Sequence, residues 1–155
     1  MRVVALFSRR GYNIDSLSVG ETEDPKTSRI TIVVTGDRQI VEQIIRQVEK
    51  LVDVRKVYEM APGRSLQREL VLVKLRSDAD TRSQITDIAE IFKAKIIDVT
   101  PTTMTMQLTG SLDKLEAFLS LAEPYGIVEL VRTGITALER GSRALSETDF
   151  HEEDR

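Results

Sequence analysis

The sequence contains no cysteine, no tryptophan and a single histidine. Without cysteine there are no disulfides and no thiol chemistry, as is usual for a cytoplasmic protein. No apolar run approaches the ~20 residues of a membrane-spanning helix, and the first residues lack the apolar core of a signal peptide. The 22 Lys and Arg are balanced by 25 Asp and Glu, so the basic excess of a nucleic-acid-binding protein is missing. We therefore expect a cytoplasmic protein that binds neither nucleic acid nor membranes.

The residues that are present indicate a folded chain without catalytic machinery. Its 155 residues are 41% hydrophobic and 30% charged, which is enough for one domain or two small ones. No HExxH, CxxC, GxSxG or P-loop pattern occurs. His151 lies in an acidic tail, where a solvated histidine is the usual interpretation, and Met104 and Met106 fit a core. The sequence therefore predicts neither catalytic residues nor a metal site.

The stretch from Leu6 to Glu23 predicts a helix, a glycine stop and an alternating strand. Gly11 can adopt the left-handed conformation that ends a helix. After it, apolar residues alternate with small or polar ones, as in a half-buried strand. The apolar side holds Ile14, Leu17 and Val19, and the other side holds Ser16, Ser18 and Gly20. Asn13 lies in the turn between helix and strand, where spacing alone favours an asparagine that bonds its own backbone.

The two halves of the chain repeat one order of elements. The first half predicts a helix over 1–10, strands over 15–22 and 30–36, a helix from Asp37 and a strand over 53–60. The second half predicts the same order, with an additional strand over 69–76 in front. A complete unit has four antiparallel strands and two helices on one face, the split βαβ arrangement. We therefore predict an α+β fold of two tandem ferredoxin-like βαββαβ domains, the first lacking its opening strand.

The predicted boundaries follow the composition. We expect a first domain over 1–61, a linker over 62–68, a second domain over 69–136 and a polar tail over 137–155. Since the opening strand of such a sheet lies between the third and fourth, its absence leaves backbone groups of the neighbouring strands unpaired. The explanation that we favour is a natural chain that starts earlier. The others are a strand supplied by another chain, a loosely folded half, or a sheet whose edges are otherwise covered.

Several long segments resemble one known family. They are LFSRRGYNIDSLSVGETED, SRITIVVTGD and LVDVRKVYE in the first half, and RELVLVKL, EIFKAKIIDVTP and GIVELVRTGITALERG in the second. With them the chain closely resembles the regulatory (small) subunits of acetolactate synthase, also called acetohydroxyacid synthase. The resemblance covers nearly the whole chain except its last residues. It implies an ACT domain in the N-terminal half and an ACT-like domain in the C-terminal half.

The resemblance also implies a function. Such subunits are not catalytic; they activate a large catalytic subunit and make it sensitive to feedback by valine or another branched-chain amino acid. Thiamine diphosphate, Mg²⁺ and FAD belong to the catalytic partner. The ACT domains pair side by side in a homodimer, with the effector at the interface. Asn13 matches the asparagine of the family's GYNI segment, and we expect Asn13, Ile14 and Ser18 to bind the effector. The family's first strand and Asn-x-x-Gly-type loop have no counterpart before Met1.

Two other classes of function remain as alternatives. One is a stand-alone ACT-type sensor of a small molecule that controls transcription. No helix-turn-helix or basic ribbon is present for it, and metal ligands are scarce. The other is a small hydrolase on the same fold, such as an acylphosphatase. The tandem units and the lack of a convergent Arg/Asn site argue against it.

Overall fold

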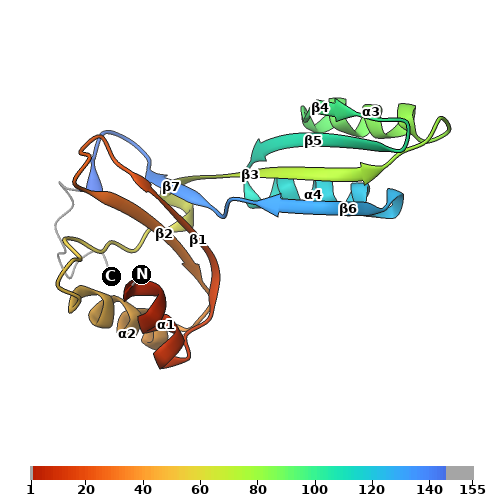
Figure 1. Ribbon diagram of the computed structural model, residues 1–155. Coiled ribbons are helices and arrows are strands. Elements are labelled where there is room, and N and C mark those ends of the chain that lie inside the picture. The colour runs from red at the N-terminus through yellow and green to blue at the C-terminus, as the bar shows by residue number, and fades with distance from the viewer. Residues whose placement is uncertain (1, 146–155) are drawn as a thin grey trace. The chain divides into compact units, whose positions relative to one another are not determined.

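The computed structural model describes residues 2–145, which divide into two units. Residues 2–66, together with residues 137–145, form the N-terminal unit, and Gln67–Thr136 form the C-terminal unit. The C-terminal unit is therefore inserted, in sequence, between two parts of the N-terminal unit. In each unit, two helices pack on a β-sheet (Figure 1).

The N-terminal unit contains α1 (Arg2–Arg10), β1 (Ile14–Glu21), β2 (Ser28–Val34) and α2 (Arg38–Glu49). β1 and β2 pair antiparallel as a two-stranded sheet. The apolar sides of both helices form its core, which consists of Val3, Leu6, Phe7, Ile44 and Val48. As predicted, α2 begins after Asp37, whose carboxylate accepts the backbone N–H of Ile40 at 2.9 Å.

The C-terminal unit is a complete ferredoxin-like domain. Its elements are β3 (Ser65–Arg76), α3 (Arg82–Phe92), β4 (Lys95–Val99), β5 (Thr103–Gly110), α4 (Leu112–Ala122), the 3₁₀ turn η2 (Glu123–Tyr125) and β6 (Ile127–Arg132). The strand order β4-β5-β3-β6 places the opening strand β3 between the third and fourth, as the sequence predicts. Met104 and Met106 belong to the buried core, as expected. The helices formed by residues 2–145 are all too short or too polar to span a lipid bilayer.

The strand predicted over 53–60 does not form. These residues are described, and they have no regular secondary structure. Val54 and Val57 nevertheless pack against the core of the N-terminal unit, which accounts for the apolar spacing that suggested a strand. In the C-terminal unit the corresponding strand, β6, pairs with β3. Among the described residues of the N-terminal unit, no strand occupies the position of β3, so no neighbouring strand of a ladder is available to residues 53–60.

Regular secondary structure occupies part of the predicted linker and part of the predicted tail. Within 62–68, residues Pro62–Arg64 form the 3₁₀ turn η1, and β3 already begins at Ser65. The first residues of the expected tail belong to β7 (Thr136–Glu139), which pairs with β3. β7 is short and only Ala137 is buried in it, so the alternation was too brief to predict.

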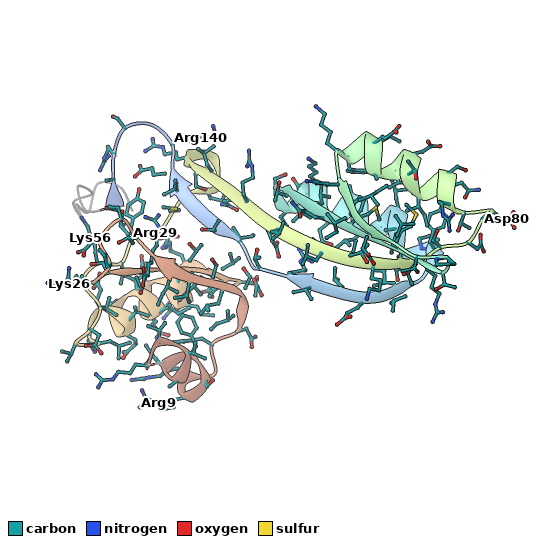
Figure 2. The ribbon with its side chains drawn as sticks, turned by 45° about the horizontal axis from the view of Figure 1, so that its top comes forward. Arg9, Lys26, Arg29, Lys56, Asp80 and Arg140 are labelled. Carbon is teal, nitrogen blue, oxygen red and sulfur yellow. The ribbon has the colours of Figure 1, made fainter. Side chains whose placement is uncertain are left out.

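Side-chain and backbone contacts hold the returning chain in the N-terminal unit. Arg29 on β2 donates from Nη2 to the carbonyl of Ala137 at 2.9 Å. The backbone N–H of Arg140 donates to the carbonyl of Arg64 at 2.8 Å. Arg29 and Arg140 are labelled in Figure 2. The segment that follows the C-terminal unit is thus bonded to two separate parts of the N-terminal unit. The remainder of the expected tail, from residue 146 on, including His151, lies outside the described residues.

Candidate functional site

The turn that carries Asn13 is fixed by the end of α1. Gly11 adopts φ +69°, as predicted. Its N–H donates to the carbonyl of Ser8 at 3.3 Å, and the N–H of Tyr12 donates to the carbonyl of Phe7 at 3.0 Å. These two bonds are the Schellman pattern of a helix C-terminus. The apolar contact that accompanies this motif is the edge-to-face pair of Phe7 and Tyr12, with ring centroids 5.8 Å apart.

A β-bulge places the residues that follow on two faces of the sheet. The register shifts between Ile14 and Ser16, so Asp15 is the additional residue of β1. Ile14 lies opposite Val34 and packs on the helical core. Ser18 lies opposite Thr31. Because side chains directly opposite each other share a face, and neighbouring Ile30 and Ile32 contact the core, Ser18 faces away from the helices.

The structure brings Asn13 and Ile14 together and separates Ser18 from them. Asn13 is exposed, and within residues 2–145 its side chain makes no hydrogen bond, so the bond to its own backbone that spacing favoured is not made. Ile14 can offer a ligand on the helix-free face only its backbone groups. Five residues of strand place Ser18 roughly 15 Å from Asn13. The effector-binding roles of Asn13, Ile14 and Ser18 stay predictions.

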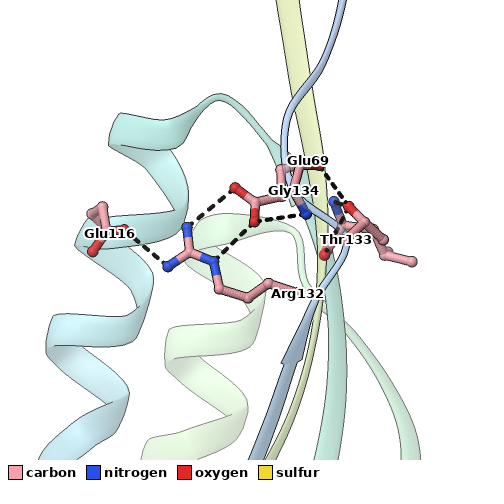
Figure 3. A network of polar contacts seen from close by, with 6 residues as sticks. Glu69, Glu116, Arg132, Thr133 and Gly134 are labelled. Atoms are coloured by element: carbon pink, nitrogen blue, oxygen red, sulfur yellow. Dashed lines mark hydrogen bonds and ion pairs between the residues drawn. The ribbon is translucent and has the colours of Figure 1, made fainter. Parts of the chain in front are cut away.

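Sequence reasoning missed a polar cluster in the C-terminal unit, shown in Figure 3. Glu69 on β3 is buried, with 4% of its side chain exposed. Arg132 at the end of β6 donates from Nε to Glu69 Oε1 at 2.9 Å and from Nη2 to Oε2 at 3.1 Å. Its Nη1 donates to Glu116 on α4 at 3.0 Å. The hydrogen bond to Glu69 raises the pKa of the Arg132 guanidinium above its usual value, so Arg132 stays charged.

The cluster includes the backbone that follows β6. The N–H of Gly134 donates to Glu69 Oε1 at 3.3 Å. The N–H of Leu70 donates to Thr133 Oγ1 at 3.1 Å, and the N–H of Thr133 donates to the carbonyl of Leu70 at 3.1 Å. We call Glu69, Glu116, Arg132, Thr133 and Gly134 the Glu69 cluster. The sequence did indicate that Glu69 is buried, because it alternates along β3 in step with the buried Val71 and Val73 and so lies on the same face of the strand.

The fold and the comparisons with known proteins define a class, that of tandem ferredoxin-like domains of the ACT type. Residues 1–56 match the family model described as AHAS small subunit-like ACT domain. Residues 68–141 match the model described as small subunit of acetolactate synthase. The first match lies in the N-terminal unit. The second covers the C-terminal unit from residue 68, including the whole Glu69 cluster, and extends over β7 into the returning chain.

Individual relatives agree with both matches. The chain is 46% identical to the acetolactate synthase small subunit of Mycobacterium leprae over 93% of this chain and 85% of that protein. It is 48% identical to the acetolactate synthase isozyme 3 small subunit of Salmonella typhimurium over 93% of this chain and 89% of that protein. The crystal structure of the acetolactate synthase small subunit from Thermotoga maritima has a TM-score of 0.83 and 42% identity, covering 92% of this chain and 89% of that one. The chain belongs to the acetolactate synthase small subunit family.

Proposed function

We propose that this chain is the regulatory subunit of an acetolactate synthase. It binds the large catalytic subunit, raises its activity and makes it sensitive to feedback inhibition by valine or another branched-chain amino acid. The chemistry and its cofactors, thiamine diphosphate, Mg²⁺ and FAD, belong to the catalytic partner. Two copies of the chain pair through their N-terminal units. The observation that carries this proposal is similarity through both units, at 46% identity over 93% of the chain, to proteins named as small subunits.

The turn at Asn13 is the proposed effector site. The amide of Asn13 is exposed and has no intramolecular hydrogen bond within residues 2–145, so it is available to a ligand. An amide and neighbouring backbone groups can pair with both the ammonium and the carboxylate of an amino acid. The Schellman turn holds Asn13 in place before the ligand arrives, which lowers the entropy lost on binding. Ile14 contributes its backbone, and Ser18 contributes to the helix-free face farther along β1.

Regulation then follows from differential affinity. An effector can shift the catalytic subunit only if it binds one arrangement of the regulatory subunit better than another. Such a coupling is typically about 1–3 kcal/mol, and it is reciprocal: the catalytic subunit in its inhibited state must raise the affinity for the effector by the same factor.

Reconstitution tests the proposal. The catalytic subunit of the same organism is purified alone and with this chain, and acetolactate formation is measured with and without valine, leucine and isoleucine. We expect the chain to raise turnover and at least one of the three amino acids to reduce it only when the chain is present. Turnover that is the same with and without the chain would overturn the proposal. If, in addition, the chain does not co-purify with the catalytic subunit, a stand-alone sensor becomes the better explanation.

Replacing Asn13 tests the effector site separately from activation. Asn13→Ala is expected to raise the valine concentration for half-inhibition roughly 5- to 10-fold, the lower part of the usual range of allosteric coupling. Activation stays unchanged, because the exposed amide makes no contact that the fold needs. Gln43→Ala, which removes an exposed amide from α2, is the matched control. Equal losses of activation and of valine response in Asn13→Ala would contradict the assignment.

A further inference from the structure

One end of the C-terminal unit brings the end of β3, the start of α3 and the turn between β4 and β5 together. Ser77 follows β3, and its backbone N–H donates to the carbonyl of Thr102 in that turn at 2.9 Å. Arg82 is the first residue of α3, and its Nη2 donates to the carbonyl of Thr100 in the same turn at 3.4 Å. The turn is closed by a bond of 2.9 Å from the N–H of Thr100 to the carbonyl of Thr103. We call Ser77, Arg82 and Thr102 the Ser77 corner.

Two donors of this corner are buried without a hydrogen bond. Ser77 alternates along the chain in step with Val73 and Leu75 of the core, so its side chain lies on the helix side of the sheet. It is 6% exposed. Among residues 2–145, neither the Ser77 hydroxyl nor the Nε of Arg82 has a hydrogen-bond partner. Buried polar groups without a partner cost free energy and are rare in native proteins, so two of them at one corner indicate a ligand.

Thr102 adds a third donor at the surface. The pairing of β3 with β5 reaches Arg76 opposite Thr103, and the bond between Ser77 and Thr102 carries it one residue further. Side chains directly opposite each other share a face, so the side chain of Thr102 lies on the same side as that of Ser77. Thr102 is exposed, and its hydroxyl makes no hydrogen bond within the described part of the chain.

The start of α3 favours negative charge at this corner. The helix has 11 residues, no acidic residue in its first turn, and an N-cap residue, Thr81, whose side chain makes no capping bond. Its positive dipole end is therefore not neutralised from within the helix. The nearby Asp78 carboxylate is engaged in its own loop, where Oδ1 accepts the N–H of Asp80 at 2.9 Å and the N–H of Thr81 at 2.9 Å. Asp80, labelled in Figure 2, is exposed.

We propose that the Ser77 corner binds a small oxyanion, such as inorganic phosphate or sulfate. The oxygens of the ion accept from the hydroxyls of Ser77 and Thr102 and from Nε of Arg82. A set of one cation and two hydroxyl donors matches a ligand rich in acceptors. A water molecule matches less well, because it has two protons of its own to place. Since Ser77 is buried, the ligand is the free ion rather than the phosphate group of a larger molecule. This site is independent of the proposed regulatory function.

Titration of the full chain with phosphate tests the site. Phosphate replaces chloride at constant ionic strength, and backbone amide NMR signals and thermal unfolding are followed. We expect the amide signals of Ser77, Arg82 and Thr102 to move together along one saturable curve. Phosphate also stabilises proteins in general by exclusion from their surface, so the comparison between variants, rather than the rise in melting temperature alone, identifies the site.

Ser77→Ala removes one buried donor and is the main variant. We expect it to raise the dissociation constant for phosphate roughly tenfold, the usual effect of one hydrogen bond to a charged group. In chloride it should be at least as stable as wild type, because the hydroxyl that it removes has no partner. Arg82→Lys keeps the charge and loses the Nε–H donor, so it should also weaken binding. Ser120→Ala, which removes an exposed hydroxyl from α4, is the control and should bind as wild type.

The possible results separate the site from its alternatives. Amide signals at the corner that do not respond to phosphate overturn the proposal. An equal response of wild type and Ser77→Ala also overturns it, because the ion then binds elsewhere or acts only through general exclusion. Loss of stability of Ser77→Ala in chloride, without phosphate binding by wild type, would show that water alone occupies the corner. If Ser77→Ala fails to fold, Arg82→Lys decides by the same titration. Phosphate binding by a chain that does not regulate the catalytic subunit supports this site and overturns only the proposed function.

Discussion

β6 and residues 53–60 have corresponding positions in the two units but different structures. Every residue of β6 is exposed, yet β6 is a strand because it pairs with β3. Residues 53–60 include Val54 and Val57, which pack on a core, yet they form no strand. Burial therefore does not decide between strand and coil here. A neighbouring strand does, because only a partner satisfies the backbone N–H and C=O groups in the extended conformation.

The core of the C-terminal unit is also larger than that of the N-terminal unit. Among residues 2–145, eleven buried residues form the core of the C-terminal unit and five form that of the N-terminal unit. Each core is centred on a phenylalanine in an edge-to-face aromatic pair: Phe118 with Phe92 at 5.6 Å, and Phe7 with Tyr12 at 5.8 Å. The environments are chemically alike, so the number of surrounding buried residues is the main difference between them.

The largest expected effect comes from truncating these two rings. Removing a buried phenylalanine to alanine usually costs about 3–5 kcal/mol, and the cost rises when the surroundings cannot collapse into the cavity. We expect Phe118→Ala near the top of this range and Phe7→Ala near the bottom, since the smaller core can relax. Urea unfolding followed by hydrogen exchange reports each unit separately. A larger cost for Phe7→Ala would show that the N-terminal core is the more rigidly packed one.

A smaller effect, of opposite sign in the two units, is expected at the helix ends. α1 is followed by Gly11 at φ +69°, and the corresponding helix α3 is followed by Lys93 at φ +58°. The left-handed conformation costs a residue with a Cβ roughly 1–2 kcal/mol. A Cβ at Gly11 would meet nothing within 4 Å, so Gly11→Ala should destabilise the N-terminal unit by about 1 kcal/mol through its backbone alone.

Lys93→Gly should have the opposite effect. Relief of the left-handed strain is partly offset by the greater freedom of glycine in the unfolded chain, which leaves a net gain of about 0.5–1 kcal/mol in the C-terminal unit. Thermal unfolding of Gly11→Ala and Lys93→Gly measures both changes in stability. If Lys93→Gly destabilised the protein, the Lys93 side chain would contribute more stability than its left-handed backbone costs.

The C-terminal unit was the more predictable one, for the same reason that it is more complete. The strand predicted over 103–110 is β5 with the same ends, because Met104, Met106 and Leu108 alternate with polar residues. Helix ends with local signals, at Asp37 and Gly11, were also predicted. The strand over 53–60 was predicted wrongly because local pattern carries no information about whether a partner strand is present.

The functional residues divide in the same way. Asn13 could be placed in its turn because Gly11 is next to it, and its effector role stays a prediction. The sequence allowed Glu69 to be placed on the buried side of β3, but not Arg132 beside it, since 63 residues separate them. β7 pairs with a strand equally distant in sequence. Contacts of this kind depend on the tertiary fold, and periodicity within one segment cannot reveal them.

The smallest expected effect is a difference in stability between cap substitutions at two helix starts, Asp37 and Ser111, that look alike in sequence. Asp37 and Ser111 both precede a helix and both are favoured capping residues. Asp37 accepts the N–H of Ile40, whereas the side chain of Ser111 makes no capping bond. Asp37→Ala should therefore cost about 1 kcal/mol, the usual value for a lost cap. Ser111→Ala should stay within ±0.5 kcal/mol, as for a surface substitution away from special features.

Measured by thermal unfolding, the difference between these two variants tests whether side-chain capping matters less in the unit with the larger core. α4 has three buried residues, Leu115, Phe118 and Ala122, that anchor it to the larger core, whereas α2 has two, Ile44 and Val48. Asp37→Asn, which keeps an oxygen acceptor, should retain most of the stability. Equal costs at Asp37 and Ser111 would mean that Ser111 caps α4 in solution, and that local capping rather than core size maintains both helix starts.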